Sequence, residues 1–400
     1  MKHYFQWSAV FASYFAILGL WVAFGPDALM TLDPVAAPRS LAAISLVFFV
    51  AMPFSGWLQK RLGFAHALVI LGGGVLSCLL FSVWMPRLLL WTTPSMFFFG
   101  SGTVTLCEMQ LIEVLAGSGQ GAQFGRARKW GSLGYVFSSA LGGAAFALIS
   151  GARSLSVAMA LCAAAFFGLC LILARACLKQ SEPKAMRHGH AQTTADTAVD
   201  MTGTVASPAV HRYLGATAIS LLRLAETATT TLFGAFWLAT GHSTFETGLL
   251  CALPVVAEFV AMWRGSALMA RWSPVVLLFI CSAVSVVRWL ATPYCSALWC
   301  AVPLQAGHAF TFGVFFPTSL LWLRREFGGT FFRTRYFVEA MARALAALIL
   351  YVATDWAIGR YGYLSVFGTG ALLALLAMGW WGYAWWAVDR LQTRRAATLA

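Results

Sequence analysis

The chain consists of long apolar runs separated by short polar stretches. Most runs contain about 20 residues or more, the length that a helix needs to cross a hydrocarbon core of about 30 Å. The runs are continuously apolar and do not alternate residue by residue, which favours membrane-spanning helices over a transmembrane barrel. Twelve spans are predicted, at residues 7–30, 40–58, 66–84, 88–115, 127–150, 155–177, 213–239, 245–269, 274–292, 297–322, 336–357 and 363–387.

One longer polar segment divides these spans into two groups of six. Residues 178–211 show no apolar period and are predicted to form a flexible linker. We therefore expect an N-terminal six-helix half at 1–177 and a C-terminal six-helix half at 212–400. The resulting fold class is an all-α membrane protein of twelve transmembrane helices in two pseudo-symmetric halves.

Composition supports a membrane protein and excludes a soluble globular one. Of the 400 residues, 60% are hydrophobic and 10% charged, and the mean hydropathy is +0.76. The 27 Lys and Arg residues outnumber the 14 Asp and Glu residues, which in a soluble protein would suggest a nucleic-acid partner.

The position of the basic residues offers a different explanation for their excess. If successive loops alternate sides, one side holds Arg39, Arg87, Arg153 and Arg360, the spans hold Arg223, Arg288 and Arg343, and all the other basic residues lie on the opposite side. Short cytoplasmic loops hold the excess of Lys and Arg in membrane proteins. We therefore expect both termini and the linker to be cytoplasmic, in a bacterial inner (cytoplasmic) membrane, with no nucleic-acid partner.

Two short matches indicate an internal repeat. GWLQKRLG (56–63) after the second span aligns with SALMARWS (266–273) after the eighth, at an offset of about 210 residues. FGRARKW before the fifth span aligns with FRTRYF before the eleventh at nearly the same offset. Parallel repeats with a site between two halves are an architecture of secondary transporters.

The segment FGRARKWGSLGY (124–135) resembles the loop and fifth helix of the lactose permease-type proton symporters of the major facilitator superfamily. The segments FWLATGHSTFETGLLCALPVVAEFVA, SVVRW and LQAGHAFTFG resemble the phenylpropionate permease branch. GWLQKRLG is similar to the loop motif of the superfamily, although Lys60 stands where an acidic residue is usual. The resemblance implies a monomeric secondary transporter that works by alternating access.

Ionisable residues inside the spans are the candidates for chemistry, because each costs about 2.5–3.5 kcal/mol at the bilayer centre. Such groups are expected to pair with one another or to face a water-filled cavity, where they bind substrate or protons. They are Glu108, Glu113, Arg223, Glu226, Glu258, Arg288, His308, Glu339 and Arg343.

The resemblance implies that Glu258, Arg288 and His308 converge at mid-membrane and couple protons to the solute. An apolar cavity favours a protonated carboxyl, and a nearby guanidinium favours the ionised form. We expect Glu258 to carry the proton, Arg288 to be its switching partner and His308 to link them by hydrogen bonds. Fixed structural ion pairing is the alternative for each.

One departure from lactose permease is Thr311, which stands where a glutamate follows the tenth-helix histidine. The resemblance therefore implies that Glu258 or a carboxylate of the fourth span takes a larger part in carrying the proton. Glu108 is the first candidate in that span for proton coupling, and Glu113 is its competitor and a candidate for substrate binding.

Arg128 and Tyr135 are the substrate candidates of the first half, together with Glu258 and Glu113. By resemblance, Arg128 forms bidentate hydrogen bonds with a sugar hydroxyl pair or a carboxylate. Tyr135 lies two helical turns later and offers a ring for a pyranose or an aromatic solute. The alternatives are a topology charge for Arg128 and core packing for Tyr135.

The remaining charges are spaced for pairing on one helix face. Arg223 and Glu226 are three residues apart, and Glu339 and Arg343 are four apart. We predict that each pair forms a structural ion pair within its own helix.

Other chemistry finds little support in the sequence. The nine cysteines show no CxxC pattern, although Cys295 and Cys300 lie near one predicted outer loop and could oxidise together. No metal site, cofactor or enzymatic motif is predicted. The sequence favours a proton-coupled importer of a small polar or anionic solute, an aromatic or other organic carboxylate before a sugar. The alternative is an exporter of drugs or metabolites that exchanges them for protons.

Overall fold

The computed structural model describes residues 4–116, 123–148, 151–180, 209–295 and 297–399, and regular structure in these residues is entirely helical. The N-terminal half contains α1, α2, α3, α4 and α5, at Tyr4–Leu32, Ala37–Trp84, Leu89–Ala116, Gln123–Leu148 and Ala152–Gln180. The C-terminal half begins with α6, α7 and α8, at Ala209–Ala239, Thr244–Arg271 and Pro274–Ala291. It continues with α9, α10, α11, α12 and α13, at Leu298–Ala306, Phe315–Phe327, Phe331–Val352, Ile358–Tyr361 and Leu364–Leu399.

The long helix α2 contains two of the predicted spans. Its backbone leaves the helical conformation at Gly63, where φ is +77° and ψ is 164°. A side chain is strained in that region, so glycine suits the break. Gly63 closes the GWLQKRLG segment, and the second and third spans therefore meet at the loop that the sequence predicts.

Two other spans are interrupted by π-helical turns. The tenth span runs through α9, the π-helix η3 at Ala309–Val314 and α10. The eleventh runs through α11, the π-helix η5 at Ala353–Ala357 and α12. Such turns are rare in helices and are frequent at functional sites.

Each of the twelve predicted spans corresponds to helical structure in the described residues. Among the described residues, nine helices are long and apolar enough to cross a membrane, and one of these, α2, holds two spans. The other two spans are α3 and α6, whose apolar sequence is interrupted by charged residues such as Glu108 and Arg223. The all-α twelve-helix fold class is confirmed.

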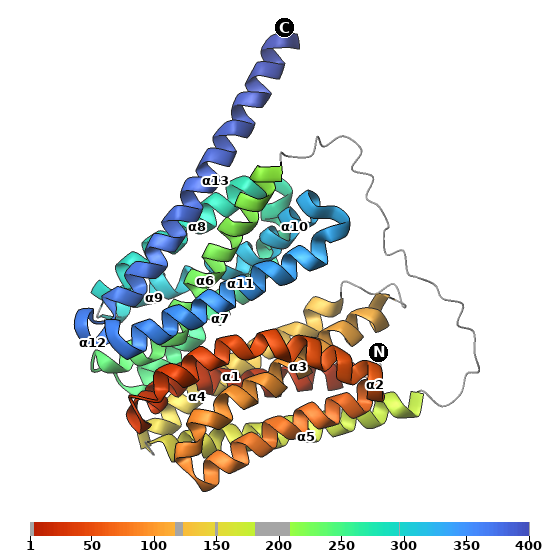
Figure 1. The fold of residues 1–400 in the computed structure, drawn as a ribbon, viewed down its shortest axis with the longest axis vertical. Helices are drawn as coiled ribbons and strands as arrows, with labels where there is room; N and C mark the ends of the chain where they lie inside the picture. Colours follow the sequence, from red (N-terminus) through yellow and green to blue (C-terminus); the bar gives the residue numbers. More distant parts are fainter. Residues whose placement is uncertain (1–3, 117–122, 149–150, 181–208, 296, 400) are drawn as a thin grey trace.

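The two halves lie side by side and converge at one end of the molecule, at the left in Figure 1. We call this the outer end, because the distribution of basic residues predicts that it faces outward. There, the Ser139 hydroxyl donates to the Gly248 carbonyl oxygen at 2.8 Å, and the Thr244 hydroxyl donates to that of Gly143 at 3.1 Å. A Cβ atom on Gly248 or Gly234 would collide with backbone of the opposite half. Small residues thus bring α4 against α7 and α6 against α1.

The described helices adjoin the predicted domain boundaries. Helix α5 ends at Gln180 and α6 begins at Ala209, whereas residues 181–208 of the predicted linker lie outside the described residues. The disulfide considered from the sequence is formed: Cys295 and Cys300 are bonded, with their Cα atoms 5.9 Å apart, between α8 and α9. This connection lies at the outer end.

Candidate functional site

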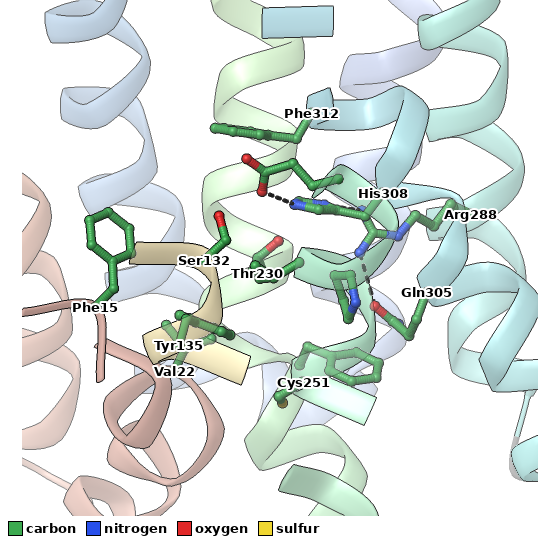
Figure 2. Close-up of a pocket in the computed structure, with 14 residues that line it drawn as sticks. Phe15, Val22, Ser132, Tyr135, Thr230, Cys251, Arg288, Gln305, His308 and Phe312 are labelled. Atoms are coloured by element: carbon green, nitrogen blue, oxygen red, sulfur yellow. Dashed lines mark hydrogen bonds and ion pairs between the residues drawn. The ribbon is translucent and has the colours of Figure 1, made fainter. Parts of the chain in front are cut away.

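A cavity of about 200 Å³ lies between the two halves. Helices α1 and α4 of the first half and α6, α7, α8, α9 and η3 of the second contribute to its wall. Its lining consists of Phe15, Val22, Ser132, Tyr135, Thr230, Phe233, Cys251, Pro254, Val255, Glu258, Arg288, Gln305, His308 and Phe312. Figure 2 shows Phe15 and Tyr135 on one side and Arg288, Gln305 and His308 on the other, so the charged groups gather in the C-terminal half.

Arg288 on α8 is the centre of a buried hydrogen-bond network. Its Nη1 atom donates to the two carboxylate oxygens of Glu226 at 3.0 and 3.2 Å and to the Thr311 hydroxyl at 2.8 Å. Its Nη2 atom donates to Oε1 of Gln305 at 2.9 Å, and the guanidinium lies 4.0 Å from the Trp289 ring centroid. A buried guanidinium is tolerable only when it is paired and hydrogen-bonded in this way.

His308 lies between two carboxylates. Its Nδ1 atom is 2.7 Å from Oε1 of Glu226 and 3.2 Å from Nη1 of Arg288, while its Nε2 atom is 3.8 Å from Oε2 of Glu258. A ring nitrogen that carries a proton cannot also accept one, and we assign the Nδ1–H group as the donor to Glu226 because that contact is the shorter. The Nε2 atom is therefore the nitrogen that can exchange a proton with Glu258.

The convergence of Glu258, Arg288 and His308 thus occurs in the structure, but the pairing differs from the prediction. Arg288 is ion-paired with Glu226, not with Glu258. Helix α6 places Glu226 against α8, where its carboxylate is 7% exposed. Glu226 therefore belongs to the site, which the sequence prediction did not state.

Arg223 and Glu226 do not form the predicted pair within α6. Arg223 makes a bidentate contact with Glu339 on α11, through Nε to Oε1 at 3.1 Å and Nη2 to Oε2 at 3.3 Å. Residues three apart lie only about 60° apart around the helix axis, so the partners offered by the neighbouring helices α11 and α8, and not the spacing, decide the pairing. The pair of Glu339 and Arg343 does exist on α11, with 3.9 Å between Oε2 and Nε.

The first half contributes Tyr135 to the cavity wall. Glu108 is half-buried on α3 and is not among the residues that line this cavity. The backbone positions of Glu113 and Arg128 fall on α3 and α4, whereas their side chains lie outside the described part of the structure. The roles predicted for these four residues remain predictions.

Several polar partners of the network escaped sequence reasoning. Gln305 and Thr311 both bind Arg288, and the Thr230 hydroxyl donates to Glu226 at 3.2 Å. Gln305 precedes His308 by three residues, and this one-turn spacing was the available signal. Thr311 is the residue that departs from the lactose permease pattern, and its hydroxyl accepts a hydrogen bond from Arg288.

No cluster of three or more His, Cys, Asp or Glu side chains suited to a metal ion occurs within the described ranges.

Comparisons with known proteins agree with the fold. Residues 7–337 match the model of the MFS_1 like family. The nucleoside transporter NupG is 14% identical, with a TM-score of 0.70 over 95% of this chain and 99% of that one. The xylose transporter XylE from E. coli, in an inward open conformation, is 11% identical, with a TM-score of 0.67 over 92% and 93%.

A bacterial homologue of the iron transporter ferroportin, in an inward-facing state, is 15% identical, with a TM-score of 0.69 over 95% of this chain and 98% of that one. No curated protein sequence matches the chain. At these identities, the structural likeness concerns the fold.

Proposed function

The chain belongs to the MFS_1 like family, and we propose that it is a proton-coupled importer of a small organic carboxylate. Members of this fold are multi-pass membrane proteins that move solutes by alternating access of two halves. Coupling to protons, transport into the cell and a carboxylate as the solute are the parts that we propose.

The contact of His308 with two carboxylates carries the proposal of proton coupling. Glu258 lines the cavity and faces Nε2 of His308, whose other nitrogen is bonded to the buried pair of Glu226 and Arg288. A proton that arrives on Glu258 removes a charge from the cavity wall and changes its interaction with the histidine. Glu258 is the proposed proton carrier, and His308 and Arg288 respond to its charge.

The lining of the cavity supports a solute with an apolar ring and a polar end. Phe15, Tyr135, Phe233 and Phe312 supply aromatic surface, whereas the polar groups lie on the side of the second half. An aromatic carboxylate fits this division, as does the resemblance to the phenylpropionate permease branch. We retain Arg128 as a proposed contact for a polar group of the solute.

Solved structures of similar fold include a nucleoside transporter and a D-xylose-proton symporter. Neutral ring-shaped solutes are therefore the alternative to an aromatic carboxylate. We place both termini in the cytoplasm of a bacterial inner membrane, from the distribution of basic residues. The closed outer end then corresponds to a conformation that faces the cytoplasm.

Uptake by proteoliposomes tests the function. Radiolabelled 3-phenylpropionate, xylose and uridine would be offered to purified protein under an imposed pH gradient of either direction. An importer accumulates 3-phenylpropionate beyond the level in protein-free vesicles when the outside is acidic, and an uncoupler abolishes this excess. Accumulation driven by an acidic interior would instead indicate export by proton exchange, and equal uptake without a gradient would contradict proton coupling.

A further inference from the structure

A second charged cluster lies beside the cavity and contains more positive than negative charge. It consists of Arg223, Glu339 and Arg343. We propose that the Arg343 guanidinium binds an anionic group of the transported solute, in an anion subsite formed by this cluster. The inference deepens the proposed function and rests on it.

The pairing within the cluster leaves Arg343 incompletely compensated. Glu339 gives both of its oxygens to Arg223 at 3.1 and 3.3 Å, whereas its contact with Arg343 is 3.9 Å long. The Arg343 guanidinium also lies 3.7 Å from the centroid of the Phe48 ring and interacts electrostatically with Tyr14. A ring quadrupole offsets the charge of a guanidinium only in part, and a membrane interior makes an uncompensated cation costly.

The position of Arg343 suits a solute contact. It extends from α11 of the second half onto a ring of α2 in the first half, so it lies at the interface whose geometry changes in alternating access. Its side chain is 26% exposed, compared with 2% for Arg288 in the buried network. Arg343 is therefore less buried than Arg288, which borders the cavity but gives its donors to the network.

Phe312 connects the cluster to the cavity. Its ring lines the cavity, stacks on His308 with centroids 5.4 Å apart and lies 5.2 Å from Cζ of Arg223. An aromatic solute that packs against Phe312 can place its carboxylate beyond this ring, near Arg223 and Arg343. A guanidinium offers two parallel N–H donors that match a carboxylate.

The charges at mid-depth in the second half are consistent with this ligand. Arg223, Arg288 and Arg343 oppose Glu226, Glu258 and Glu339, so these six groups sum to zero when every one is ionised and His308 is neutral. A proton on Glu258 raises the sum to +1. A solute with one negative charge restores neutrality, which favours joint binding of a proton and a monoanion.

Ligand binding to the purified full-length protein tests the subsite. The probes are 3-phenylpropionate and its neutral amide, 3-phenylpropanamide, which differ in charge at one end. Their dissociation constants would be measured by calorimetry for the wild type, Arg343→Gln, Arg343→Lys and Arg360→Gln. Arg360 is the matched control because it is an exposed arginine just beyond the end of the same predicted span.

We expect Arg343→Gln to weaken binding of the acid at least tenfold, with little change for the amide. Arg343→Lys should recover part of the loss, and Arg360→Gln should bind as the wild type does. Folding should survive because Arg223 still compensates Glu339, and melting without ligand checks this.

Unchanged affinity of Arg343→Gln for the acid would overturn the subsite, as would a wild type that binds the acid no better than the amide. The two proposals can fail separately. If acid binding depends on Arg343 but uptake does not respond to the pH gradient, the subsite is supported and the proposed proton coupling is rejected.

Discussion

His308 faces Glu258 across the cavity wall, with 3.8 Å between Nε2 of the ring and Oε2 of the carboxylate. The opposite ring nitrogen is bonded to Glu226, which neutralises Arg288. The histidine thus stands between a permanently paired carboxylate and one on the cavity wall. This difference in setting is the reason for proposing Glu258 as the proton carrier and Glu226 as a fixed charge.

The substitution Glu258→Gln removes the proposed proton carrier but retains a polar side chain. We expect accumulation driven by a pH gradient to fall at least tenfold, because the neutral amide cannot release a proton. Exchange of labelled for unlabelled solute should continue, because it needs no net proton transfer. Both are measured in proteoliposomes containing 3-phenylpropionate.

The control for this variant is Glu246→Gln in the first turn of the same helix, α7. Glu246 is half-buried, lies outside the residues that line the cavity and forms a capping box with Ser243 that glutamine can also form. It should transport normally. Gradient-driven accumulation that persists in Glu258→Gln would assign the proton to another group.

The buried pair of Arg288 and Glu226 predicts an asymmetric effect on stability. Arg288→Gln leaves a carboxylate that is 7% exposed without its guanidinium, and breaking a buried pair in this way costs about 3–5 kcal/mol. Removal of both charges in Arg288→Gln with Glu226→Gln should restore most of the lost melting temperature. The melting temperatures of the wild type, Arg288→Gln and the double variant would be measured by thermal unfolding in detergent.

Arg223→Gln provides the comparison, because Arg343 remains within 3.9 Å of Glu339 and can take over the pairing. Its loss of melting temperature should be smaller than that of Arg288→Gln. A double variant as unstable as Arg288→Gln would show that the charge pairing is not the source of the effect.

The close approach of α4 and α7 predicts that the outer end needs glycine to close. In Gly248→Val, the new side chain would meet the Ser139 carbonyl and hold the halves apart. Uptake should fall at least tenfold while solute binding persists, because closure and not the cavity is affected. Gly168→Val on α5, where a Cβ meets no atom within 4 Å, is the control. Normal uptake by Gly248→Val would show that this contact is dispensable.

Charge balance predicts the electrical character of transport. A monoanion that enters with one proton moves no net charge, so uptake of 3-phenylpropionate should respond to a pH gradient but not to a potassium diffusion potential set with valinomycin. Radiotracer uptake under each gradient separates the two forces. Uptake driven strongly by the potential would contradict the paired entry of one proton and one monoanion.

Much of the fold follows from sequence because a bilayer imposes length and polarity on each span. The twelve runs, the break at Gly63 and the repeated basic loops all have local signals. The π-helical turns η3 and η5 have none in the hydrophobic pattern, since they change helix geometry without changing polarity.

The charged residues of the site were also visible, because each interrupts an apolar run. Their partners were not predictable from spacing. Arg223 and Glu226 satisfy the one-turn rule, yet the former pairs with Glu339 and the latter with Arg288. Contacts between helices decided the pairing, and these depend on how each helix is rotated about its axis.

Proton movement driven by the solute is the most direct test of the central claim. Proteoliposomes that enclose a pH-sensitive dye would receive external 3-phenylpropionate with no imposed gradient, and a flux of the undissociated acid through the lipid would be subtracted with protein-free vesicles. The account predicts protein-dependent acidification of the interior for the wild type and its absence for Glu258→Gln. Protein-mediated entry of the solute without acidification, or equal acidification in both proteins, would contradict it.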